Sequence, residues 1–288
     1  MTAAAIHLVP TPACPVCEEP AGATFLTRAE VAAELRARHR FFPRGGRDLT
    51  EAVLGIPAAI LRCTHCGVLV RDDAPDESAF RDDRYDDREL ELLHATHVQA
   101  FAAKELDYRS LLPPDARVIE VGSYAGGFLT AAARWGWRAS GADIGRDPVR
   151  FCRRLGLDVQ CRPLEECNIE TESLDAVFIW NCFEQIARPI SLLGEAHRAL
   201  RTGGLLVIRV PDADFYIRRR QLSALAHNGL LGWPHRFGYD AAAVRRLAQK
   251  QRFAFVRTLR RPAVRPLREA RMSGETDHGW IELTFRKE

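Results

Sequence analysis

The stretch Val118-Ile-Glu-Val-Gly-Ser-Tyr-Ala-Gly-Gly-Phe128 decides the fold of this 288-residue chain. It has the pattern of a buried strand, a glycine turn and the start of a helix. A second strand then ends at Gly141-Ala-Asp143, which places its acid 23 residues after Glu120. Together these features predict a doubly wound α/β domain that holds an adenosine-containing cofactor.

Strand and helix patterns alternate from about residue 88 onward, which predicts a largely parallel sheet covered by helices. The predicted strands are Arg117–Val121, Arg138–Ala142, Asp158–Cys161, Ala176–Trp180 and Gly204–Val210, with two late edge strands at Phe253–Leu259 and Gly279–Phe285. The predicted helices are Arg88–Leu112, Gly127–Trp135, Pro148–Leu155 and Pro189–Leu200. We therefore expect a Rossmann-like, seven-stranded α/β sheet with helices on both faces.

Composition and charge are those of an ordinary globular protein. Hydrophobic residues make up 47% and charged residues 27% of the chain, and the net charge of +3 is too small to indicate a nucleic-acid partner. No apolar run is long enough to cross a membrane, and the N-terminus does not have the pattern of a signal peptide. We expect a cytoplasmic protein that binds neither a membrane nor nucleic acid.

Four of the eight cysteines form two Cys-x-x-Cys pairs, Cys14-Pro-Val-Cys17 and Cys63-Thr-His-Cys66, separated by 45 residues. Each pair presents two thiolates on a tight turn, and two such turns complete the tetrahedral site of structural zinc. The predicted metal ligands are Cys14, Cys17, Cys63 and Cys66. The alternatives are a redox dithiol and a site that has lost its metal. The other cysteines, Cys152, Cys161, Cys167 and Cys182, are expected to be small buried hydrophobes.

The cysteine pairs and the charge pattern divide the chain into three parts. Residues 1–70 form a small zinc-binding domain, in which Ala29–His39 is expected to be helical. Residues 71–90 are acidic and polar, which is typical of a solvated connector. Residues 91–288 form the cofactor-binding domain.

The glycine turn and the strand ends supply the candidate cofactor contacts. Gly122 allows a sharp backbone turn, and Gly126 lets the next helix approach closely. Glu120 can accept a hydrogen bond from an ammonium group, and Asp143 can accept hydrogen bonds from both ribose hydroxyls. The predicted cofactor-binding residues are Glu120, Gly122, Ser123, Tyr124, Gly126, Asp143, Glu165 and Asn181.

A dinucleotide is the competing ligand for this turn. Its motif, G-x-G-x-x-G, has a middle glycine where this chain has Tyr124. The carboxylate of Glu120 would also repel a nearby pyrophosphate. These differences favour S-adenosylmethionine as the cofactor.

Several segments resemble class I S-adenosylmethionine-dependent methyltransferases. Residues 118–143 resemble motif I and the ribose-binding strand, and Leu174–Pro189 is similar to the fourth strand and its turn. Leu200–Asp212 is similar to the fifth strand after a Gly-Gly turn, and Gly232–Tyr239 to a later Pro-His segment. The paired cysteines resemble the zinc-binding members that include sugar C-methyltransferases, without their extra C-terminal domain. Gln185 stands where many relatives have a histidine after Glu184.

Methyl transfer requires alignment of the acceptor and, for some acceptors, removal of a proton. The preferred general base is His235, because an imidazole titrates near neutral pH. The predicted catalytic set is His235, Glu184, Asn181 and Tyr239, with Tyr85, Asp212, Tyr216, His227 and Asn228 as further candidates. His94 and His97 are expected on a helix surface, and Arg218-Arg-Arg220 on a solvated face.

The resemblance implies methyl transfer to oxygen or carbon of a small molecule, such as a sugar, a nucleotide-sugar or a secondary metabolite. We expect a monomer or a homodimer. The alternatives are an RNA methyltransferase whose zinc domain grips nucleic acid, a binding module that has lost its chemistry, and a different reaction of the same cofactor. The acidic segment beside the cysteines argues against RNA.

Overall fold

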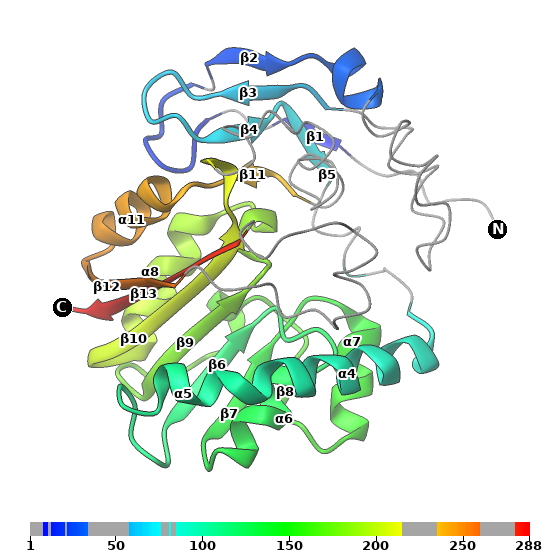
Figure 1. Ribbon diagram of the computed structural model, residues 1–288, viewed down its shortest axis with the longest axis vertical. Coiled ribbons are helices and arrows are strands. Elements are labelled where there is room, and N and C mark those ends of the chain that lie inside the picture. Colours follow the sequence, from blue (N-terminus) through cyan, green and yellow to red (C-terminus); the bar gives the residue numbers. More distant parts are fainter. Residues whose placement is uncertain are drawn as a thin grey trace. The chain divides into compact units, whose positions relative to one another are not determined.

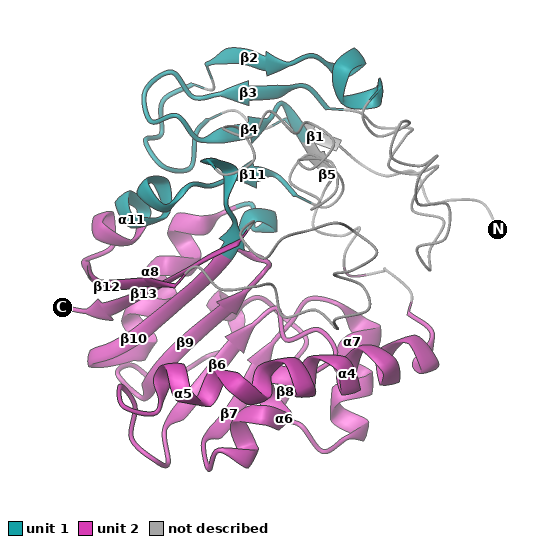
Figure 2. Ribbon diagram, viewed as in Figure 1, with its two compact units in different colours: residues 1–77, 184–187, 210–247 teal, residues 78–183, 188–209, 248–288 magenta. Residues whose placement is uncertain are grey.

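The computed structural model describes residues 8–10, 13–20, 22–33, 58–75, 81, 85–214, 235–259 and 280–288. The chain divides into two compact units, which Figure 2 colours separately. Unit 1 comprises residues 1–77, 184–187 and 210–247, and unit 2 comprises residues 78–183, 188–209 and 248–288. Each unit is therefore assembled from segments that lie far apart in the sequence.

Unit 2 contains most of a seven-stranded sheet in the order β12-β13-β10-β9-β6-β7-β8 (Figure 1). The strands from β10 to β8 pair in parallel, whereas β12 and β13 are antiparallel. The strands are β6 Arg117–Val121, β7 Arg138–Ala142, β8 Val159–Gln160, β9 Leu174–Trp180, β10 Leu200–Pro211, β12 Phe253–Leu259 and β13 Trp280–Lys287. The predicted seven-stranded α/β sheet is confirmed, although β8 is shorter than expected and β10 begins earlier.

The helices follow the predicted pattern with one interruption. They are α4 Asp87–Phe101, η1 Ala102–Lys104, α5 Glu105–Tyr108, α6 Gly127–Arg134, α7 Arg146–Arg154, η2 Leu164–Glu166, η3 Phe183–Gln185, α8 Pro189–Ala199 and α11 Ala241–Lys250. The segment expected as one helix over Arg88–Leu112 is broken by the 3₁₀ turn η1. That turn directs Lys104 into the interior, where its ammonium group pairs with Glu282.

Every residue of β9 is buried, as expected for the centre of a sheet covered on both faces. Side chains from α4, α5, α6 and α7 pack on one face of the sheet against alternate residues of β9 and β10. Aromatic rings fill this core, with Phe128 and Phe178 at a centroid distance of 4.8 Å. The parallel strands are thereby held with their carboxyl ends at one edge, where ligands bind in this class of sheet.

Unit 1 is built on a four-stranded sheet in the order β11-β4-β3-β2 and a two-stranded sheet of β1 and β5. The strands are β1 Leu8–Pro10, β2 Ala23–Leu26, β3 Ile60–Arg62, β4 Leu69–Arg71, β5 Asp73–Pro75 and β11 Phe237–Gly238. The first residues of the predicted connector thus lie in strands. Residues 28–33 are helical, and the rest of the predicted helix Ala29–His39 lies outside the described residues.

Some predictions fall outside the described part of the chain. They concern Tyr216, Arg218–Arg220, His227 and Asn228. Among the helices that are described, none is long and apolar enough to cross a membrane.

Candidate functional site

The predicted glycine turn joins β6 to α6 and uses left-handed backbone at three positions. Gly122, Tyr124 and Gly126 have φ angles of 72°, 45° and 69°. A Cβ atom at Gly122 would lie 2.7 Å from the sulfur of Cys182, so a side chain there would clash as well as strain the backbone. Tyr124 adopts the same backbone region at a steric cost that glycine would not carry.

Asp143, which directly follows β7, is hydrogen-bonded to this turn. Asp143 accepts hydrogen bonds of 2.7 Å from the backbone N–H groups of Tyr124 and Gly145, one on each carboxylate oxygen. Each oxygen has a second lone pair, so the carboxylate can still accept hydrogen bonds from two hydroxyls. Burial raises the pKa of Asp143, while the two N–H groups act in the opposite direction.

Glu120 lies on β6, two residues before the turn, and is only 3% exposed. Its Oε2 atom has no hydrogen-bond partner among the described residues, and the same holds for the hydroxyl of Ser123. Burial, and secondarily the charge of Asp143, raises the pKa of Glu120 well above its usual range. A cationic group of a ligand would offset the free-energy cost of burying the ionised carboxylate of Glu120. The site therefore fits a ligand with an ammonium group and hydroxyls.

Helix α4 packs directly on the turn, so the expectation that His94 and His97 lie on a free helix surface is wrong. The Nδ1 atom of His94 is 2.7 Å from the carbonyl oxygen of Ala125, and both histidines are partly buried. A Cβ atom at Gly127 would lie 2.3 Å from the Cβ of His97. The ring of Tyr124 meets those of Tyr85 and His97 at centroid distances of 5.2 and 6.1 Å.

The remaining predicted cofactor residues lie after other strands. Glu165 lies on η2, after β8, and is partly exposed. Asn181 directly follows β9 and has a φ angle of 55°. Its N–H group donates to the carbonyl of Arg209 at 3.0 Å, and its Oδ1 atom accepts from the Arg209 guanidinium at 2.9 Å. Sequence reasoning missed Arg209, although an arginine in the otherwise apolar stretch from Leu205 to Pro211 of β10 was a visible signal.

Three of the predicted catalytic residues belong to unit 1. The Nε2 atom of His235 lies 3.4 Å from a carboxylate oxygen of Glu184. Tyr239 and Glu184 are fully buried, and His235 is 7% exposed. Within unit 1 the structure brings His235, Glu184 and Tyr239 together, and Asn181 belongs to unit 2.

Burial and secondarily the charge of Arg71 lower the pKa of His235 to about 3. Burial likewise raises the pKa of Tyr239 well above its usual value. Both side chains are therefore neutral near pH 7. A neutral imidazole can accept a proton, whereas a tyrosine hydroxyl in this state serves as a hydrogen-bond donor.

The backbone around these residues is held by β4 and by the segment after β10. Phe237 pairs with Val70, and the carbonyl of Tyr239 accepts from the N–H of Ala213 at 2.9 Å. The N–H of Arg236 donates to the carbonyl of Glu184, also at 2.9 Å. The His235–Tyr239 segment is thus part of the sheet that carries the second cysteine pair.

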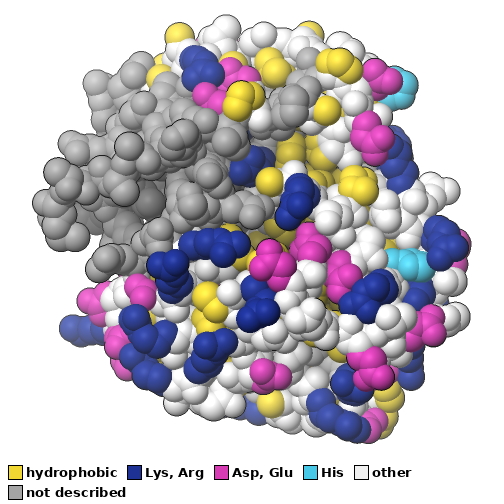
Figure 3. All heavy atoms as spheres, turned by 180° about the vertical axis from the view of Figure 1, so that it is seen from behind, with side chains coloured by type: hydrophobic (Ala, Val, Ile, Leu, Met, Phe, Trp, Pro, Cys, Tyr) yellow, Lys and Arg dark blue, Asp and Glu magenta, His cyan; other side chains and the backbone are white. Residues whose placement is uncertain are grey.

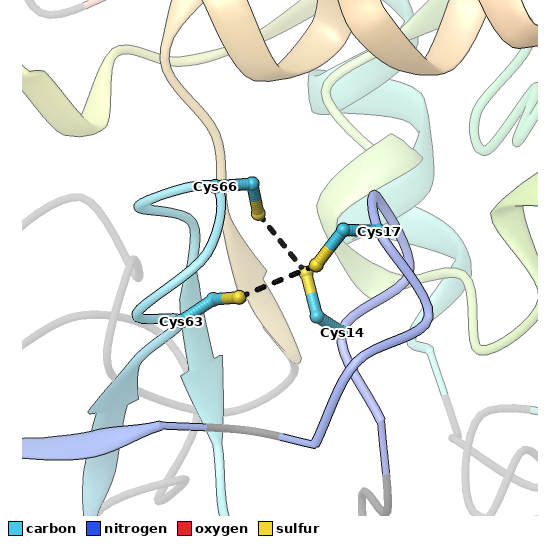
Figure 4. A group of neighbouring side chains, drawn as sticks. All are labelled: Cys14, Cys17, Cys63 and Cys66. Atoms are coloured by element: carbon cyan, nitrogen blue, oxygen red, sulfur yellow. Dashed lines mark hydrogen bonds between the residues drawn. The ribbon is translucent and has the colours of Figure 1, made fainter.

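Figure 4 shows the four paired cysteines pointing toward one another. The sulfur atoms of Cys14 and Cys66 are 3.2 Å apart and those of Cys17 and Cys63 are 3.4 Å apart. All four sulfur atoms lie within 4.8 Å of one another. A zinc ion with Zn–S bonds of about 2.3 Å needs S–S distances of about 3.8 Å, which lies between the 3.2 Å of the Cys14–Cys66 pair and the 4.8 Å within which all four sulfur atoms lie, so small shifts would fit the donor set to tetrahedral zinc. The guanidinium of Arg246 also donates to the carbonyl of Cys66 at 2.8 Å.

A seven-stranded sheet, a glycine turn after β6 and an acid at the end of β7 define the fold of class I S-adenosylmethionine-dependent methyltransferases. Residues 94–258 match the family model described as "Methyltransferase domain". This match covers more than half of the chain, which therefore belongs to that family.

A curated relative and two solved structures are similar to this chain. The ubiquinone biosynthesis O-methyltransferase of Parvibaculum lavamentivorans is 25% identical over 142 residues, which cover 47% of this chain and 55% of that protein. The chain thus spans about half the length of this relative.

The solved structures share the fold at low identity. A SAM-dependent methyltransferase from Archaeoglobus fulgidus has a TM-score of 0.50 and 16% identity, covering 66% of this chain and 94% of its own. A chain from the complex of the Haloferax volcanii Trm112 methyltransferase activator with a methyltransferase has a TM-score of 0.52 and 17% identity. This similarity covers 69% of the present chain and 92% of that chain.

Proposed function

We propose that this protein transfers the methyl group of S-adenosylmethionine to an oxygen or carbon atom of a small molecule. The observation that carries this proposal is the hydrogen bond from Tyr124 to Asp143, together with a buried carboxylate oxygen of Glu120 to which no described residue donates a hydrogen bond. A sugar, a nucleotide-sugar or a secondary metabolite is the acceptor class we favour. The name of the O-methyltransferase relative supports transfer to oxygen.

The residues of the turn have distinct roles in this proposal. Glu120 would accept a hydrogen bond from the ammonium group of the cofactor, and Asp143 from its ribose hydroxyls. The N-terminus of α6, which begins at Gly127, offers backbone N–H groups to a carboxylate. Glu165 and Asn181 would complete the site. The bound cofactor supplies an activated methyl group on a sulfonium, so alignment is the main task of the protein.

His235 is the proposed general base for acceptors that must lose a proton. Burial keeps its imidazole neutral near pH 7 but also makes it a weaker base than a free histidine, so the proposed role depends on the carboxylate of Glu184, at 3.4 Å, to stabilise the imidazolium. Tyr239 would act as a hydrogen-bond donor. Gln185 cannot accept a proton in the way a histidine can, so we assign this role to His235.

We also propose that residues 1–70 form a zinc-binding domain in which Cys14, Cys17, Cys63 and Cys66 bind one structural Zn²⁺. The support is the convergence of the four sulfur atoms from two separate turns. Because all four positions around the metal are filled by protein ligands, the ion would stabilise the fold and take no part in the transfer.

The net charge of +3 is too small to indicate a nucleic-acid partner, which supports a small-molecule acceptor over RNA. The face that Figure 3 shows carries acidic as well as basic side chains, although four arginines of α7, Arg146, Arg150, Arg153 and Arg154, line one hollow. An RNA affinity that falls steeply with salt would favour the alternative.

Calorimetric titration with S-adenosylmethionine and S-adenosylhomocysteine tests the proposed function. We expect micromolar binding by the zinc-loaded protein and at least a tenfold loss in Asp143→Ala. Asp115→Ala is the matched control, because Asp115 is exposed and pairs only with the surface residue Arg138 in the described structure. Absence of binding to the intact protein would contradict the proposal.

A further inference from the structure

Three side chains form a row across neighbouring strands of the seven-stranded sheet. Trp180 on β9 and Arg209 on β10 are register partners, so their side chains lie on the same face. β13, which begins at Trp280, is the next strand beyond β10. The guanidinium carbon of Arg209 lies 4.8 Å from the ring centroid of Trp280. We call these three residues the Trp-Arg-Trp row.

The row lies at the edge of the sheet where the cofactor turn begins. Val121 pairs with Ile179, and Ile179 pairs with Ile208, so Gly122, Trp180 and Arg209 are level with one another. Strands in a sheet are about 4.8 Å apart, which places Arg209 about 10 Å from the turn. A molecule on the row would thus lie beside a cofactor held by the turn.

The polar groups of the row are hydrogen-bond donors and not acceptors. A guanidinium has five N–H donors and an indole has one, and neither has an acceptor. Trp180 is 5% exposed, and its Nε1 atom has no hydrogen-bond partner among the described residues. Arg209 is also 5% exposed and donates one N–H to Asn181. A buried donor without a partner calls for an acceptor that the described protein does not supply.

Arg209 supplies the positive charge of the row, and the tryptophan rings supply flat apolar surface. The ammonium group of Lys104 also lies 5.6 Å from the ring centroid of Trp180, but its charge is paired with Glu282 and Asp107. Tryptophan and arginine both stack on planar groups, and arginine binds carboxylates in a bidentate geometry. A ligand with an aromatic ring and a carboxylate would use both features of the row, because its ring can stack and its carboxylate can bind the guanidinium.

We propose that the Trp-Arg-Trp row binds the methyl acceptor and that this acceptor is a planar aromatic molecule carrying a carboxylate. This inference rests on the proposed function and narrows its acceptor class. The carboxylate accepts hydrogen bonds from Arg209 and from the Nε1 atom of Trp180, while the ring stacks beside Trp280. Arg209 also fixes the amide of Asn181, which lies at the end of the same strand as Trp180.

The test uses salicylate and salicylamide as probes, which share a ring and a hydroxyl and differ in the charge of one group. Calorimetry is carried out on the full zinc-loaded chain with and without S-adenosylhomocysteine. We expect salicylate to bind at least tenfold more tightly than salicylamide. In Arg209→Met this ratio should fall to about one. Trp180→Phe, which keeps a ring and removes the N–H group, should weaken salicylate binding several-fold.

The control variant is Trp137→Phe, because Trp137 is equally buried on the same core face and stacks on Phe178. It should leave both affinities unchanged, and thermal unfolding verifies that each variant is folded. The inference is overturned if acid and amide bind equally, if the ratio survives Arg209→Met, or if salicylate does not bind a protein that binds S-adenosylhomocysteine. If salicylate binds through Arg209 but the protein binds no cofactor, the row is a ligand site and the methyltransferase proposal is refuted.

Discussion

The ammonium group of Lys104 lies 2.5 Å from the Oε2 atom of Glu282, and both side chains are buried, at 8% and 3% exposure. The hydroxyl of Tyr108 donates to the other carboxylate oxygen of Glu282. The ion pair of Lys104 and Glu282 therefore joins the helical segment before β6 to β13, which comes from the C-terminal part of the sequence of unit 2.

Removing one partner of this pair should destabilise the protein strongly. In Glu282→Leu a buried ammonium group loses its nearest counter-charge and keeps only the longer contact with Asp107 at 3.6 Å, and we expect a loss of about 3 kcal/mol in the free energy of unfolding, measured in urea. The double variant Glu282→Leu, Lys104→Met should recover part of that loss, because the buried carboxylate of Asp107 then loses the ammonium group. Asp115→Ala, which breaks an exposed ion pair with Arg138, should cost less than about 1 kcal/mol. Equal effects of the buried and exposed variants would show that the buried charges are reached by water.

The close approach of α4 to α6 predicts opposite effects for two glycine substitutions. Gly127→Ala places a Cβ atom 2.3 Å from that of His97, so the helices must separate, at a cost of about 1–3 kcal/mol. Gly194 lies within α8, and the nearest atom to its new Cβ would be 3.6 Å away. Gly194→Ala should therefore be neutral or stabilising by up to about 1 kcal/mol. Thermal unfolding of both variants checks this, and a tolerated Gly127→Ala would contradict the close packing.

Removal of a cysteine ligand should abolish zinc binding. We expect the purified protein to contain one Zn²⁺ per chain, held by the four clustered cysteines, and Cys63→Ser to contain far less, as measured by atomic emission. A strong chelator should lower the melting temperature of the wild type, because metal binding contributes directly to the folding free energy. Cys161→Ser, at a cysteine outside the cluster, should retain the metal. Full zinc content in Cys63→Ser would exclude the four-sulfur site.

The low pKa of His235 predicts a loss of stability in mild acid. An unfolded histidine has a pKa near 6.5, whereas burial lowers the pKa of folded His235 to about 3. The unfolded state therefore binds the extra proton between these values. The contribution of neutral His235 to the free energy of unfolding is fully present above about pH 6.5. It falls by about 1.4 kcal/mol for each pH unit below that value.

The measurement compares unfolding free energies of the wild type and His235→Gln between pH 5 and 7.5. The contribution of His235 is the difference between the two curves, since the other histidines titrate in both proteins. If the difference does not change with pH, the carboxylate of Glu184 compensates the charge of a protonated His235, and the imidazole is a stronger base than its burial implies.

Local patterns were sufficient to predict the sheet and the glycine turn. The pattern of strand, glycine turn and helix start predicted β6, and β7 was also predicted at its observed bounds. The glycines at 122 and 126 adopt the left-handed backbone that only glycine adopts without strain. The clustering of the four cysteines also followed from their spacing. These features depend on neighbours in the sequence or on a well-known donor geometry.

Relationships between distant segments could not be predicted in this way. Neither the hydrogen bond from Tyr124 to Asp143 nor the position of Arg209 between two tryptophans leaves a periodic signal in the sequence. The placement of His94 and His97 against the turn depends on how α4 crosses α6. Periodicity identifies a helix, but the packing angle that decides which side chains are buried arises only in the folded chain.

The pairing of β11 with β4 has a consequence for how the chain is made. During synthesis the cysteine pairs and β4 leave the ribosome first, but the strand that completes their sheet belongs to the segment around Phe237. Contacts between residues so far apart in sequence form slowly, because a long loop must close before they are gained. Between those two moments the edge of β4 is uncovered and prone to pair with another chain. This period lasts until the segment around Phe237 has been synthesised, so slower translation of the intervening residues should increase how much protein aggregates.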